Sequence, residues 1–200
     1  MDLIPEWNPE ENIMMETEVR KKSTENMSLN VVIRNAKRED CPEISRLTKE
    51  LASYLQKPGE VEMTVEDLEQ NGFCIKSPLY KSLVVEDPAE TGEVFNSDGS
   101  TDLPRKLIGV AVFYYGFSTW KGKILYLENF IISEKYRGNG LGEALFRQVC
   151  QVAKEEDCKT LEFIAINGTR AINFYRRFRA KDMTLLHNGH LYMIDRKDFT

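Results

Sequence analysis

The sequence has few histidines and cysteines and no long apolar run. Its two histidines and four cysteines form no CxxC pair and no histidine–cysteine cluster, so neither a zinc site nor a disulfide framework is indicated and we expect no metal. No stretch reaches the about 18 apolar residues that a membrane span requires. The N-terminus lacks a basic segment followed by an apolar run, so we expect no secretory signal and a cytoplasmic protein.

Basic residues are also in the minority. The chain has 27 Lys and Arg against 32 Asp and Glu, a formal net charge of −5. Nucleic acids and anionic membranes attract basic surfaces, so we expect neither as a partner. With 42% hydrophobic residues over 200 positions, the chain is typical of a soluble globular protein that can bury a core without metal or disulfides.

The composition and the apolar periodicity of the chain change near residue 29. Residues 1–28 are rich in Glu, Asn, Met and Lys without sustained periodicity, which favours a disordered extension. Residues 29–200 are predicted to form one domain.

Apolar periodicity and turn residues predict the elements of that domain. Strands are expected at 29–34, 82–86, 107–115, 123–132 and 160–166, with a final pair of short strands after Met183. Helices are expected from Asp40 to about 55, from a Thr64 capping box to Gly72, at 141–156 and at 169–177, and a loop at 87–106. This order predicts an α/β (α+β) fold with a mixed central sheet flanked by helices on both faces, antiparallel early and parallel across the central β-α-β crossover.

A glycine-rich turn, Arg137-Gly-Asn-Gly-Leu-Gly142, joins the 123–132 strand to the 141–156 helix. Glycines let consecutive N–H groups converge on an anion, and the helix N-terminus adds more donors. Neither a Walker loop nor a dinucleotide fingerprint fits, because Gly142 precedes Glu-Ala and the glycines fall at every second position. A phosphate cradle of another type is favoured, with a purely structural turn as the alternative.

This motif resembles the pyrophosphate-binding motif of GCN5-related N-acetyltransferases. Residues 123–142 (KILYLENFIISEKYRGNGLG) and 171–175 (AINFY) are similar to the corresponding parts of the diamine (spermidine/spermine) acetyltransferases. The resemblance runs weakly from Val31 to Asp195. It implies acetyl-CoA as co-substrate, a small amine as acceptor and a homodimer.

The resemblance also implies which residues form the site. Coenzyme binding is expected of Phe130, Ile131 and Ile132, whose strand opens away from its neighbour, and of Arg137, Gly138, Asn139, Gly140, Leu141, Gly142, Glu143, Asn167 and Arg177. Amine binding is expected of Tyr54, Trp120, Glu128, Asn129 and Glu162.

Two residues are assigned to catalysis. An alkylammonium with a pKa near ~10.4 must lose a proton before it attacks, and Glu128, in an otherwise apolar strand, can hold the amine and relay that proton. Tyr175 matches the family's tyrosine that protonates the departing thiolate. The plain alternatives are an outward-facing strand residue for Glu128 and a packing residue beside Phe174 for Tyr175. The cysteines lie outside the motifs, which favours direct attack in a ternary complex.

The sequence departs from the diamine enzymes around the acceptor. Glu128-Asn129 stands where those enzymes carry Glu-Asp, and only Glu60 and Glu62 supply charge after the first helix. Since each desolvated ammonium needs a partner, a lysine-like amino acid such as thialysine fits as well as a diamine or polyamine. Acetylation of protein lysines or N-termini, and a non-enzymatic acyl-CoA-binding module, are the alternative functions.

Overall fold

The computed structural model describes residues 17–19, 29–91, 105–189 and 191–199. It divides into two compact units, Met1–Phe163 and Ile164–Thr200. Most of the predicted extension, residues 1–16 and 20–28, lies outside the described residues, so its disorder stays a prediction, as does a domain boundary at residue 29. Thr17–Val19 forms a short strand that the sequence did not predict.

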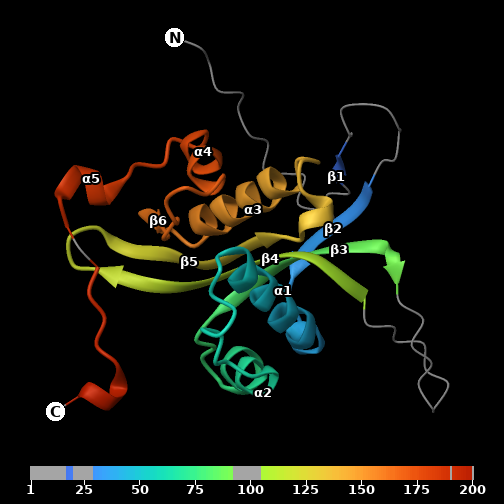
Figure 1. Ribbon diagram of the computed structural model, residues 1–200, viewed down its shortest axis with the longest axis horizontal. Helices are drawn as coiled ribbons and strands as arrows, with labels where there is room; N and C mark the ends of the chain where they lie inside the picture. Colours follow the sequence, from blue (N-terminus) through green and yellow to red (C-terminus); the bar gives the residue numbers. More distant parts are fainter. Residues whose placement is uncertain (1–16, 20–28, 92–104, 190, 200) are drawn as a thin grey trace, which may run out of the picture. The chain divides into compact units, whose positions relative to one another are not determined.

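The first unit is built on a six-stranded sheet in the order β1-β2-β3-β4-β5-β6 (Figure 1). All neighbours are antiparallel except β5 and β6, which confirms the predicted topology. The strands are β1 Thr17–Val19, β2 Leu29–Asn35, β3 Lys81–Thr91, β4 Arg105–Ser118, β5 Gly122–Ile132 and β6 Thr160–Glu162. The loop predicted at 87–106 is therefore wrong at both ends, where β3 and β4 extend into it, and its residues 92–104 lie outside the described part.

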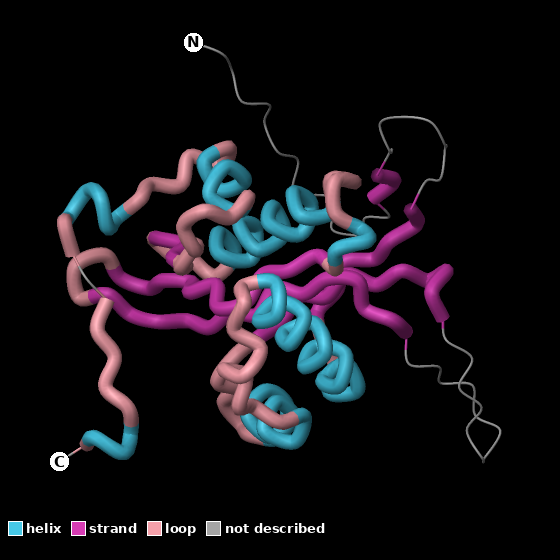
Figure 2. Tube along the Cα trace, viewed as in Figure 1, coloured by secondary structure: helices cyan, strands magenta, loops and turns pink. Residues whose placement is uncertain are grey.

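Helices cover both faces of this sheet, as predicted (Figures 1 and 2). Helix α1 (Cys41–Tyr54) lies on one face and α3 (Leu141–Glu155) on the other. The core beneath α1 consists of Ile44, Leu47, Val84, Leu107, Val110, Val112 and Ile131. On the opposite face, Phe130 of β5 meets Phe146 of α3 edge to face, with ring centroids 5.7 Å apart. Each face thus has its own apolar layer.

Helix α2 (Val65–Glu69) begins with the predicted capping box. Asp67 N–H donates to Thr64 Oγ1 at 3.1 Å, and Thr64 N–H donates to Asp67 Oδ2 at 3.1 Å. The predicted end at Gly72 is wrong, because the chain continues through one π-helical turn, η2 (Gln70–Cys74). A Cβ at Gly72 would lie 2.6 Å from the Tyr80 ring, so the glycine allows close packing there instead of ending the helix.

The second unit contains α4 (Ala171–Arg176), α5 (Met183–His187) and η4 (Arg196–Asp198). The final pair of strands predicted after Met183 is wrong for the residues described, since 183–187 is helical and 191–199 pairs with no strand. Strand propensity forms a strand only where a partner is available. No helix in the described ranges has the length and hydropathy needed to cross a membrane.

Candidate active site

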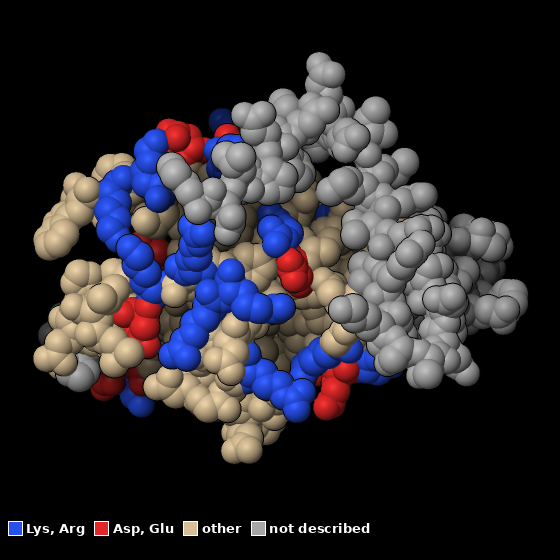
Figure 3. Space-filling view, turned by 90° about the horizontal axis from the view of Figure 1, so that it is seen from above, with Lys and Arg blue, Asp and Glu red and all other residues tan. Residues whose placement is uncertain are grey.

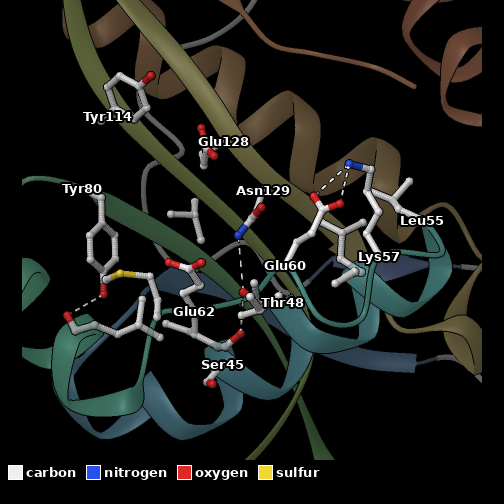
Figure 4. A pocket seen from close by; sticks show the side chains of 17 residues that line it. Ser45, Thr48, Leu55, Lys57, Glu60, Glu62, Tyr80, Tyr114, Glu128 and Asn129 are labelled. Carbon is white, nitrogen blue, oxygen red and sulfur yellow. Dashed lines mark hydrogen bonds and ion pairs between the residues drawn. The ribbon is translucent and has the colours of Figure 1, made fainter. Parts of the chain in front are cut away.

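A β-bulge in β5 defines the acceptor side of the site. On β4, Val112 pairs with Asn129 and Phe113 pairs with Leu127, so Glu128 is the extra residue and faces no partner. Adjacent strand residues normally point to opposite faces of a sheet. Here Glu128 and Asn129 line the same cavity on the α1 face (Figure 4), because a bulge re-aims one side chain.

This cavity has a volume of about 460 Å³ and lies between α1, the 55–63 segment, α2 and the β4–β5 hairpin. Its floor is apolar and comes mainly from α1 and β4. Among the described residues that line it are three carboxylates, those of Glu60, Glu62 and Glu128, and the ammonium of Lys57. Lys57 Nζ contacts Glu60 Oε2 at 2.8 Å, so one of the three carboxylates is already paired.

Glu128 lies beside two stacked tyrosines. The rings of Tyr114 and Tyr126 are 5.0 Å apart and inclined by 30°. Burial raises the pKa of both phenols, and the negative charge of Glu128 raises them further. No cation pairs with Glu128 within the described part of the chain. A carboxylate without a cation next to aromatic faces is suited to hold an ammonium group.

A hydrogen bond to helix α1 holds the side chain of Asn129 in place. Its Nδ2 donates to Thr48 Oγ1 at 3.4 Å, and the Thr48 hydroxyl donates to the Ile44 carbonyl at 2.9 Å. Figure 4 shows Nδ2 of Asn129 directed at Thr48 and the amide oxygen on its other side, where an N–H donor of a ligand can meet it.

The parallel pairing of β5 and β6 is short. It joins Ile124 to Thr160, Leu125 to Leu161 and Tyr126 to Glu162. Strand β6 ends there, whereas β5 continues to Ile132. Beyond Tyr126, β5 has no β6 partner, as the predicted opening of this strand requires. The backbone of Phe130–Ile132, assigned above to the acetyl and pantetheine groups, pairs with β4 on one edge and has no β6 partner on the other.

The glycine-rich loop has the geometry of an anion cradle. Gly138 has φ 83° and Gly140 has φ 81°, conformations in which other residues are strained. Gly140 is the N-cap of α3 and, as a glycine, makes no side-chain cap; the N-terminus of a helix supplies N–H donors that suit an anion. The buried side chain of Asn139 stabilises the loop through Nδ2, which donates to the Tyr136 carbonyl at 3.2 Å.

Arg137 precedes the first glycine and is held in place. Its Nε donates to the Ile132 carbonyl at 2.8 Å, and its guanidinium carbon lies 4.7 Å from the centroid of the Tyr54 ring. Tyr54 was predicted to bind the amine, but it does not line the cavity. Lysine and arginine are prominent on the face of the molecule that carries α3 (Figure 3), which suits an anionic ligand.

Three predicted residues belong to the second unit. Tyr175 is buried, and burial raises the pKa of its phenol to about 12; its ring meets Phe174 edge to face at 5.1 Å. The guanidinium of Arg177 lies 5.3 Å from the centre of the Phe174 ring. Asn167 is exposed in the turn before α4.

The remaining predicted residues lie elsewhere in the first unit. Trp120 is 95% exposed in the β4–β5 turn and does not line the cavity. Glu162 lies opposite Tyr126 in the register and accepts from Thr160 Oγ1 at 2.9 Å. Glu143 pairs with Arg147 at 2.8 Å on α3. Sequence reasoning missed Tyr114, Tyr126 and Thr48; the pairing of the two predicted hairpin strands could have indicated the two tyrosines.

The comparisons with known proteins agree with this geometry. The acetyltransferase (GNAT) family model matches residues 69–179. The chain is 32% identical to thialysine N-epsilon-acetyltransferase of Bos taurus over 82% of its length and 92% of that protein. It is also 32% identical to human spermidine/spermine N(1)-acetyltransferase-like protein 1, over 83% of this chain and 23% of that protein.

Solved structures share the fold. An aminoglycoside acetyltransferase from an uncultured soil metagenomic sample, in complex with sisomicin, aligns with a TM-score of 0.61 at 14% identity, covering 83% of this chain and 97% of that one. The fold is that of solved acetyltransferases, and the chain belongs to the acetyltransferase (GNAT) family. It is an acetyl-CoA-dependent N-acetyltransferase.

Proposed function

We propose that this enzyme acetylates the primary amine of a small diamine, polyamine or lysine-like amino acid by direct attack on acetyl-CoA in a ternary complex. The observation that carries this proposal is the bulge at Glu128, which puts an unpaired carboxylate beside Tyr114 and Tyr126 in a cavity of about 460 Å³. Small-molecule sites commonly have this size. The names of the thialysine and spermidine/spermine relatives support an alkylamine acceptor.

Glu128 binds the ammonium group and takes up its proton, directly or through water. An alkylamine with a pKa near ~10.4 is almost wholly protonated at neutral pH, so proton removal has to accompany the attack. The exposure of Glu128 allows the proton to pass on to solvent. Asn129, next to this carboxylate on β5, helps to orient the amine, and Glu162, opposite Tyr126 on β6, adds negative charge near the stacked tyrosines.

The end of β5 that extends beyond β6 and the glycine loop hold the coenzyme, which supplies the acetyl group as a thioester. Backbone N–H groups of Phe130–Ile132 stabilise the negative charge that develops on the acetyl oxygen. The loop from Gly138 to Gly142, the first turn of α3 with Glu143, and Arg137 bind the phosphates. Coenzyme contacts are also proposed for Asn167 and Arg177.

Tyr175 gives its proton to the leaving thiolate. As the amine nitrogen bonds to the acetyl carbon, the carbon–sulfur bond breaks and the sulfur takes the phenolic proton. The nitrogen loses its second proton to solvent, and Tyr175 regains a proton from solvent, so the whole reaction releases one proton. A phenol whose pKa is raised to about 12 by burial is fully protonated at neutral pH, as a proton donor must be.

Direct transfer requires no acyl-enzyme. No cysteine is among the described residues that line the cavity. Cys41 is buried, and burial raises the pKa of its thiol to about 11, so the nucleophilic thiolate is scarce at neutral pH. No metal enters the proposal; within the described ranges, no group of three or more His, Cys, Asp and Glu side chains could hold one.

Within this amine class, the lining charges favour a lysine-like amino acid. Lys57 pairs with Glu60 and repels the additional ammonium groups of a polyamine, whereas it attracts an α-carboxylate. Glu62 and Glu128 remain for the α-ammonium and the side-chain amine. The bovine thialysine enzyme, aligned over 92% of its length, supports the same choice.

We further propose a cytoplasmic homodimer. Leu191, Tyr192, Met193 and Ile194 are 68–85% exposed in this chain, and a run of exposed apolar residues of this kind commonly marks a protein interface. Light scattering on the purified protein measures the oligomeric state, and a monomer at micromolar concentration would contradict this assignment.

The function is tested by measuring CoA release from acetyl-CoA with spermidine, spermine, putrescine, thialysine, lysine and a lysine peptide, for wild type and Tyr175→Phe. We expect turnover with thialysine that collapses in the variant. If acetyl-CoA is bound but no small amine is acetylated, the proposal is wrong and a protein acceptor or a binding role takes its place.

A further inference from the structure

Helix α1 is attached to the segment that leads into the glycine loop. The carboxylate of Glu50 accepts from the Ser133 hydroxyl at 3.0 and 2.9 Å, and from the Glu134 N–H at 3.0 Å. These two residues connect β5 to η3 (Glu134–Tyr136), the short turn directly before Arg137. Among the described residues, the only other partner of Glu50 is Arg46, at 3.3 Å on the same helix. One carboxylate thus fixes both a side chain and the backbone at the entrance of the loop.

The same helix reaches Arg137 one turn later. The Tyr54 ring lies 4.7 Å from the Arg137 guanidinium, and the Nε of Arg137 donates to the Ile132 carbonyl. Its two terminal nitrogens have no partner among the described residues. Arg137 is therefore held by the end of β5 on one side and by a ring of α1 on another, with its two terminal NH2 groups directed to no described residue and suited to a phosphate.

Glu43 offers a matched comparison on α1. Its carboxylate accepts from the Leu107 N–H at 3.1 Å and pairs with Arg46 at 2.8 Å. Like Glu50, it attaches α1 to the backbone of the sheet. Unlike Glu50, it does so at the start of β4 and has no contact with the loop. Comparing variants of Glu43 and Glu50 therefore separates an effect on the stability of the fold from an effect on the position of Arg137.

We propose that Glu50 and Tyr54 are positioning residues for coenzyme binding, acting through Arg137. The inference rests on the proposed function, in which Arg137 binds a phosphate of acetyl-CoA. Because the opposite face of α1 lines the amine cavity through Ser45 and Thr48, one helix then aligns both substrates.

The test is the Kd of CoA by calorimetry, together with kcat and the KM for acetyl-CoA. We expect Glu50→Ala to raise both Kd and KM about tenfold and to leave kcat within about twofold, since the amine side is intact. Tyr54→Ala should raise Kd about threefold to tenfold, and Tyr54→Phe, which keeps the ring, should restore it. Glu43→Ala should destabilise the protein to urea as much as Glu50→Ala but leave Kd unchanged.

A double-mutant cycle decides whether Glu50 acts through the arginine. In an Arg137→Ala background, Glu50→Ala should raise Kd no further, because residues that act as a unit are not additive. Additive effects, or an equal rise in Glu43→Ala, would overturn the inference. An unchanged Kd in Glu50→Ala would overturn it alone, whereas a wild-type protein that binds no CoA would overturn the proposed function with it.

Discussion

Glu128 and Asn129 are adjacent in sequence, yet both side chains line the cavity on the α1 face of the sheet. Regular strand geometry would have turned one of them toward α3. The bulge that skips Glu128 in the pairing with β4 removes this alternation. A single extra residue thereby gives the acceptor site a carboxylate and an amide side by side. We propose that the carboxylate attracts the ammonium group and that the amide orients it.

Replacing Glu128 with Gln removes the proposed base while keeping shape and polarity. We expect kcat/KM for the amine to fall about 10²- to 10⁴-fold, the range typical of general acid–base catalysis. The Kd of CoA should not change, because the carboxylate lies on the acceptor side. Steady-state kinetics with thialysine and calorimetry with CoA measure the two effects. Glu66→Gln, an exposed carboxylate of α2 that does not line the cavity, is the control, and an equal loss in both variants would contradict the assignment.

Tyr175→Phe should lower kcat about 10²- to 10⁴-fold with CoA binding retained, because only the phenolic proton is lost. Since burial raises the pKa of Tyr175 to about 12, its proton stays in place as the pH rises from 6 to 10. The wild-type rate should therefore rise over this range as the amine loses its proton, without an alkaline decline. A decline well below pH 10 that disappears in Tyr175→Phe would refute this. Tyr115→Phe, at a tyrosine outside the cavity lining, is the matched control.

Lys57 sets the preference between zwitterions and polyamines. Lys57→Gln removes a positive charge from the cavity and releases Glu60. We expect kcat/KM for spermidine to rise and that for thialysine to fall, each about threefold to tenfold at low salt, with both effects shrinking as salt screens the charges. The ratio of the two kcat/KM values measures this, and Lys76→Gln, outside the cavity lining, controls for net charge. A ratio that does not move would mean that Lys57 has no part in acceptor choice.

Local rules were sufficient for much of the fold. The Thr64–Asp67 capping box, the amphipathic stripe of α3 and the β4–β5 hairpin depend on residues close in sequence, and all three were predicted. The glycine loop was also accessible, because Gly138 and Gly140 adopt positive φ values that few other residues tolerate.

Features that depend on distant residues were not accessible. The bulge at Glu128 follows from the register between two strands, which the alternation within either strand does not fix. Tyr54 was assigned to the amine, whereas its ring lies against Arg137, far along the chain. The prediction of strands after Met183 was wrong for a related reason, because strand-like residues there find no partner among the described strands.

The close approach of β4 and β5 near the coenzyme side depends on Gly109. A Cβ at this position would lie 2.5 Å from Ile132 Cδ1 and 3.0 Å from the Ile131 carbonyl oxygen. The side chain can move, but the carbonyl belongs to the backbone of β5, in the stretch that extends beyond β6. We expect Gly109→Ala to lower the free energy of unfolding by about 1–3 kcal/mol and to raise the KM for acetyl-CoA, because the strand that meets the acetyl group is displaced. Urea unfolding and steady-state kinetics measure both. Gly59→Ala, where a Cβ would meet nothing within 4 Å, should change neither, so similar losses in the two variants would show that the tight contact at Gly109 is not the cause.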